Sequence, residues 1–117
     1  IFFNKGNGQF EFKPLPASAQ VAPLFAFDTF NLTNSTGILA GGNFSGVIPY
    51  EGIYDADWGD ILTIDKQKIL KKINSASGGF LLRGEVRDIK TIKTAHGVIY
   101  AVSFNNKGIE FFKQVDK

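Results

Sequence analysis

The sequence predicts an all-β fold of antiparallel meanders with no significant helix. Twelve of its 117 residues are phenylalanine. Apolar residues, many of them aromatic or β-branched, fall in runs of about five, which is the usual length of a strand. Clusters of Gly, Asn and Asp separate these runs, as expected for tight turns between strands. The 44% hydrophobic and 21% charged fractions are typical of one small globular domain.

The first half of the chain predicts two strand pairs. Residues 1–13 alternate apolar and polar on both sides of the turn KGNG, in which Gly6 and Gly8 can take positive φ. A connector with three prolines follows, and it interrupts any ladder. The runs LFAFDTF and TGILAGG form the second pair. The segment NFSGVIPYEGIYDADWG, rich in Gly and aromatic residues, predicts a long ordered loop.

The second half of the chain predicts further strands in up-and-down order. The segment DILTIDKQKILKKI indicates two strands with a turn near Asp65, although ILKKI also fits one helical turn. NSASGG is expected to be a turn or linker. Three strands follow, VRDIKTIKT, VIYAVSF and IEFFKQV, with turns at residues 96–97 and 105–108. The total is eight or nine strands.

Four phrases in this order carry a family resemblance. They are NKGNGQFEFKPLPASAQVAPLFAF, a degenerate D-x-D-x-D-G loop leading into ILAGGN, GIYDADWG, and GEVRDIKTIKTAHGVIYAVSFNN. The chain resembles the C-terminal part of bacterial FG-GAP/VCBS-repeat proteins of the Bacteroidetes type. The resemblance implies two to three β-propeller-like blades: the end of one in residues 1–13, a second in residues 19–75 and a third in residues 84–117. It also implies a fragment of a longer protein of the cell envelope or a secreted one.

The same resemblance implies a calcium loop that has lost its ligands. The family's carboxylate positions are occupied here by Thr29, Asn31, Thr33 and Gly37. Calcium binds about six to eight oxygens that must include negative charge, and these residues supply none. We therefore expect no metal and no cofactor. We expect the turn to persist because Asn and Thr side chains bond to the backbone.

The densest group of aromatic and acidic residues gives the candidate ligand-binding site. Its members are Tyr50, Tyr54, Asp55, Asp57 and Trp58. Carboxylates beside aromatic rings are typical of sugar-binding and glycosidase sites. An architectural role, with Trp58 filling a gap between blades, fits at least as well as a binding role. An acid/base pair of Asp55 and Asp60 is a third possibility, and it needs both carboxyls in one cleft. Solvent exposure of Tyr54 and Trp58 separates the first two hypotheses.

Composition excludes several functional classes. The absence of cysteine excludes disulfides, thiol nucleophiles and thiolate metal sites. The formal net charge of +2 indicates no nucleic-acid partner, and the lack of a run of about 18 apolar residues indicates no membrane insertion. His96, the single histidine, is expected to be solvated at a turn without a catalytic partner.

The predicted function is accordingly that of a non-catalytic scaffold or protein-interaction module rather than an enzyme. The alternative is a carbohydrate-binding module that uses the loop around Tyr54 to Trp58. The expected partner is a protein or a glycan. Exposed strand edges also predict homo-oligomers.

Overall fold

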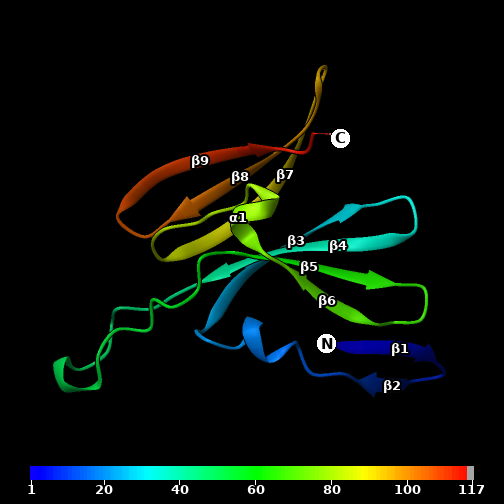
Figure 1. The fold of residues 1–117 in the computed structure, drawn as a ribbon, viewed down its shortest axis with the longest axis horizontal. Helices are drawn as coiled ribbons and strands as arrows, with labels where there is room; N and C mark the ends of the chain where they lie inside the picture. The colour runs from blue at the N-terminus through cyan, green and yellow to red at the C-terminus, as the bar shows by residue number, and fades with distance from the viewer. Residues whose placement is uncertain (116–117) are drawn as a thin grey trace.

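The computed structural model describes residues 1–115, in which nine strands form three antiparallel sheets (Figure 1). The first sheet is a hairpin of β1 (Phe2–Gly6) and β2 (Gln9–Phe12). The second is a four-stranded meander of β3 (Leu24–Asn31), β4 (Ser35–Gly42), β5 (Asp60–Asp65) and β6 (Leu70–Ile73). The third contains β7 (Val86–Thr94), β8 (Gly97–Phe104) and β9 (Lys107–Lys113). The prediction of an all-β fold of antiparallel meanders is confirmed.

The described residues contain three short helical turns. Two are 3-10 turns, η1 (Ala17–Ala19) and η2 (Pro49–Glu51), and the third is α1 (Ser75–Gly78). Helix α1 replaces the expected linker, because the Asn74 side chain caps it by accepting from Ser77 N–H at 3.2 Å. Gly79 then ends it with a left-handed φ of 70°. The helical alternative for ILKKI is wrong, since Leu70–Ile73 is a strand.

The core lies between the β3–β6 and β7–β9 sheets, which pack face to face. Leu39 of the first sheet and Ile89 and Val102 of the second are almost fully buried. A Cβ on Gly41 would stand 2.8 Å from Val86 Cγ2, so the glycine is what lets the sheets approach at this point. Because β3 and β7 both pack at this interface, the sheets form one folded unit.

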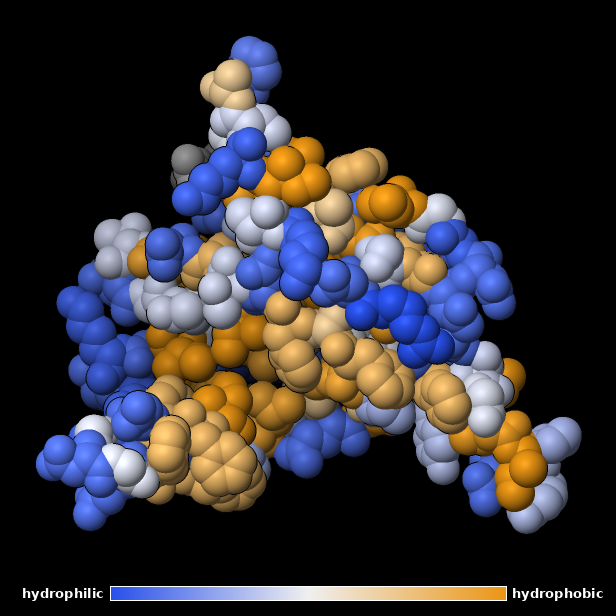
Figure 2. Space-filling view, turned by 180° about the vertical axis from the view of Figure 1, so that it is seen from behind, coloured by the Kyte–Doolittle hydropathy of each residue, from blue (hydrophilic) through white to orange (hydrophobic). Residues whose placement is uncertain are grey.

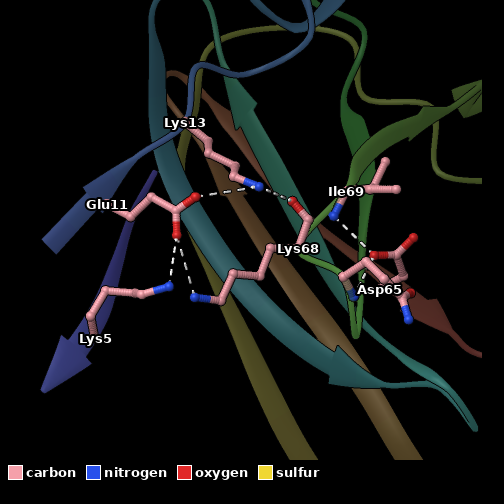
Figure 3. A network of polar contacts seen from close by, with 7 residues as sticks. Lys5, Glu11, Lys13, Asp65, Lys68 and Ile69 are labelled. Carbon is pink, nitrogen blue, oxygen red and sulfur yellow. Dashed lines mark hydrogen bonds and ion pairs between the residues drawn. The ribbon is translucent and has the colours of Figure 1, made fainter.

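Ionic contacts attach the N-terminal hairpin to the turn between β5 and β6 (Figure 3). The Glu11 carboxylate lies 3.2 Å from Lys5 Nζ, and 3.6 Å from both Lys13 Nζ and Lys68 Nζ. Lys13 Nζ also donates to the Lys68 carbonyl at 3.3 Å. Within the turn, Asp65 accepts from Ile69 N–H at 2.9 Å. The opposite face of the hairpin exposes three rings, those of Phe2, Phe10 and Phe12.

The predicted loop at Thr29, Asn31, Thr33 and Gly37 is a β-hairpin. Thr29 and Asn31 belong to β3 and Gly37 to β4, where it pairs with Phe30. The turn is closed by the backbone, with Leu32 N–H donating to the Ser35 carbonyl at 3.0 Å. The expectation that Asn and Thr side chains hold it was wrong. Among residues 1–115, no hydrogen bond comes from the side chains of Asn31, Thr33 or Asn34, and strand pairing reaches the turn at Asn31 and Thr36.

A cleft around Trp58

The segment between β4 and β5 is the ordered loop that the sequence predicts. It projects from the sheets as an arm, drawn in green in Figure 1. Phe44 and Tyr54 pair their backbones at its base, with N···O distances of 2.8 and 3.0 Å. Tyr50 lies at the tip in η2 and is 85% exposed. This candidate residue is therefore separated from the rest of the group.

The base of the arm forms one wall of an open cleft of about 300 Å³. Three of the candidate residues line it with exposed side chains: Tyr54, Asp55 and Trp58. The segment between α1 and β7 supplies the facing wall, where Arg83 and Glu85 lie. The structure therefore brings together residues that are about 25 positions apart in the chain, such as Trp58 and Arg83. Local sequence patterns cannot predict a contact over that separation.

Trp58 is 51% exposed and Tyr54 is 44% exposed. The Arg83 guanidinium lies over the Trp58 ring, 5.2 Å from its centroid, which is a cation–π arrangement. Leu82 N–H donates to the Trp58 carbonyl at 2.9 Å and fixes the backbone beside the ring. Because half of its surface faces solvent, Trp58 does not fill a gap between the sheets of residues 1–115, which disfavours its expected place between blades.

Asn43 and Asp57 form a buried support beneath the cleft. Both are nearly inaccessible, at 4% and 3% exposure. The Asn43 amide donates to the carbonyls of Asp57 at 2.7 Å and Gly84 at 3.1 Å, and its Oδ1 accepts from Asp57 N–H at 3.0 Å. Asp57 Oδ1 accepts from Gly59 N–H at 3.1 Å. Burial, followed by the nearby Asp60 charge, raises the pKa of Asp57 above its ordinary value.

The Asp57 side chain therefore positions the loop instead of presenting a carboxylate to a ligand. Sequence analysis missed Asn43. The one available signal was an asparagine directly after Gly41 and Gly42 at the end of a strand, since asparagine tolerates the left-handed φ of 76° found here.

Glu85 gives the facing wall a fixed negative charge. It accepts from Ser45 N–H at 2.8 Å and from Asn105 Nδ2 at 2.9 Å, and it pairs with Arg87. Hydrogen bonds from Ser45 and Asn105 hold the pKa of Glu85 below its ordinary value. Arg83 and Glu85 thus place a positive and a negative charge across the cleft from Tyr54 and Trp58. Neither residue was among the candidates predicted from the sequence.

Asp55 and Asp60 do not face one cleft. Asp55 is exposed in the cleft, whereas Asp60, the first residue of β5, is fully buried and pairs with Lys72 of β6. The geometry that an acid/base pair requires is therefore not present at these two carboxyls. Within residues 1–115, no group of three or more acidic or histidine side chains is placed to hold a metal ion.

Comparison with known proteins returned no match, neither to a family model, nor to a curated protein, nor to a solved structure. No helix in the described part of the chain is long and apolar enough to cross a membrane.

Proposed function

We propose that this protein is a non-catalytic binding module whose cleft around Trp58 recognises carbohydrate. The observation that carries the proposal is the half-exposed Trp58 ring in an open cleft beside Tyr54 and Asp55. A ligand site combines large apolar surfaces with a few polar groups that fix orientation. Here Tyr54 and Trp58 supply the apolar surface. Asp55, Arg83 and Glu85 supply the polar groups.

These groups match the chemistry of a sugar ring. One face of a pyranose presents C–H groups that pack against an aromatic ring, while its hydroxyls donate to carboxylates and accept from a guanidinium. The support by Asn43 and Asp57 favours this function, because a rigid wall loses little entropy when a ligand binds.

Replacing Trp58 with alanine is expected to weaken glycan binding by at least about tenfold, because the stacking surface is lost. Trp58 is the single tryptophan, so its fluorescence reports binding directly in the unaltered protein. A panel of polysaccharides is titrated, and any hit is measured again by calorimetry with Trp58→Ala. Tyr50→Ala is the matched control, since it removes an exposed aromatic ring outside the cleft. Equal affinities of Trp58→Ala and the unaltered protein for the hit, or no hit in the panel, would contradict the proposal.

A scaffold role within a repeat protein is the second candidate. It is supported by aromatic side chains that the sheets leave exposed, and Figure 2 shows broad hydrophobic areas on the back of the molecule. In this form of the proposal β3–β6 is one complete four-stranded blade, β7–β9 belongs to the next and β1–β2 ends the preceding one. The family resemblance would then place the module in the cell envelope or outside the cell.

A further inference from the structure

A second cleft, of about 380 Å³, opens between the inner faces of the two larger sheets. We call it the inter-sheet cleft, and it shares no residue with the cleft described above. The strand pair of Leu39 and Ile61 lines one side of it, and the strand pair of Tyr100 and Phe112 lines the other. Residues 77–80, from α1 and the segment after it, also contribute to the lining.

Aromatic rings form much of the wall of the inter-sheet cleft. Phe30 and Tyr100 are an edge-to-face pair with 6.3 Å between their ring centroids, and Phe80 and Phe112 are a second pair at 4.9 Å. Phe80 and Tyr100 are only 3% and 5% exposed, so the core holds these rings in place. Fixed ring surfaces of this kind suit the flat face of another ring system, because little entropy is lost when it binds.

The inter-sheet cleft offers no counter-charge to an ionised ligand. Among residues 1–115, Lys113 is the one charged residue in its lining. Lys113 pairs with Ile99, on the face of β8 opposite to Tyr100, so its side chain lies on the outer side of the sheet. A Cβ on Gly97 would stand 3.8 Å from Lys113 Cε, which agrees with this placement. Because a buried charge without a partner is costly, the cleft favours a neutral ligand.

The Tyr100 hydroxyl is a polar group without a partner in this lining. Tyr100 is 5% exposed, and its hydroxyl forms no hydrogen bond within residues 1–115. Asp28 accepts instead from Thr91 Oγ1 at 2.6 Å. Burial, followed by the Asp28 charge, raises the pKa of Tyr100, so the hydroxyl keeps its proton at neutral pH. A buried tyrosine hydroxyl usually has a hydrogen-bond partner, and a ligand oxygen that accepts from it would supply one.

We propose that the inter-sheet cleft binds a small neutral ring compound whose carbonyl oxygen accepts a hydrogen bond from Tyr100. Ligand pockets measure about 300 to 1,000 Å³, and this one is near the lower end of that range. A sugar is a poor occupant, because its many hydroxyls would be buried against apolar walls. The site is therefore independent of the cleft around Trp58 and of the function proposed for it.

Fluorescence titration of the full chain with 6-propionyl-2-dimethylaminonaphthalene tests the proposal. This probe is a neutral naphthalene with one carbonyl group. Its emission moves to shorter wavelength in apolar surroundings and to longer wavelength when the carbonyl accepts a hydrogen bond. The unaltered protein is expected to bind one probe per chain with emission at shorter wavelength than in water. Tyr100→Phe is expected to weaken binding about fivefold, because one hydrogen bond is lost, and to move the bound emission to still shorter wavelength.

Tyr54→Phe is the matched control, because it removes a tyrosine hydroxyl from the other cleft. It should leave the affinity and the bound emission unchanged. Ile73→Trp places a larger side chain at the rim of the inter-sheet cleft, where Ile73 is 39% exposed, and should abolish binding. Circular dichroism melting checks that each variant is folded.

Four results would overturn the proposal. The first is no emission change with the unaltered protein up to the solubility limit of the probe. The second is a Tyr100→Phe protein with the affinity and bound emission of the unaltered protein. The third is a loss of binding in Tyr54→Phe, which would place the probe in the other cleft. The fourth is a bound fraction that falls as the protein concentration rises, which would show that a second copy covers the inter-sheet cleft. None of these results depends on glycan binding at Trp58, so the two proposals can fail separately.

Discussion

Replacing Lys72 with alanine is expected to lower the free energy of unfolding by about 3 kcal/mol, because it leaves a buried carboxylate without its counter-charge. Asp60 is fully buried, and the Lys72 side chain is 20% exposed. Among residues 1–115, Lys72 is the one basic group within ion-pairing distance of Asp60, and no side-chain hydrogen bond reaches Asp60 Oδ2. Urea unfolding followed by circular dichroism measures the change.

Lys71→Ala is the matched control, because it removes an exposed lysine from the adjacent position of β6. Surface changes of this kind are usually within about 0.5 kcal/mol. Adding Asp60→Asn to Lys72→Ala should recover part of the lost stability, since the buried group is then neutral. A Lys72→Ala protein as stable as the Lys71→Ala protein would show that the ion pair between Lys72 and Asp60 does not stabilise the fold.

Asn43→Ala is expected to lower the free energy of unfolding by about 2 to 4 kcal/mol, because two buried backbone groups and one partly buried group lose their partner together. These are the N–H and carbonyl of Asp57 and the carbonyl of Gly84. Alanine also tolerates the left-handed φ of 76° poorly. The same change frees the cleft wall, so acrylamide should quench Trp58 fluorescence more readily than in the unaltered protein.

Asn43→Gly separates the two causes. Glycine adopts the positive φ without strain but restores none of the hydrogen bonds. If the bonds dominate, the glycine and alanine variants should be similarly destabilised, measured by the same urea unfolding. A glycine variant with the stability of the unaltered protein would assign the whole effect to backbone strain and refute the role of the hydrogen bonds.

The strands could be predicted because a hairpin needs particular residue types at its turn, directly between two apolar runs. Positive φ at Gly6 and Gly8 and the Gly97 turn occur where Gly, Asn and His interrupt apolar runs. The four-residue helix α1 was missed because a segment of Ser, Ala and Gly has no apolar periodicity. It forms through the Asn74 cap and the Gly79 end instead.

The candidate site could be predicted only where its residues are close together in the sequence. Tyr54, Asp55 and Trp58 are local, and they do line the cleft. Arg83 and Glu85 come from another segment, and tertiary folding alone brings them to the aromatic wall. Tyr50 is exposed at the tip of the arm, whereas Asp57 is buried. This difference depends on how the arm folds back where Phe44 pairs with Tyr54.

The three lysines around Glu11 make the N-terminal hairpin responsive to ionic strength. The ammonium groups and the carboxylate are partly exposed, and at about 1 M salt the screening length falls to about 3 Å, close to the ion-pair distances themselves. Concentrated salt would therefore loosen the hairpin and leave it tethered by the proline-containing segment before β3. The distance between the exposed rings of Phe2, Phe10 and Phe12 and the rest of the protein would then depend on the salt concentration.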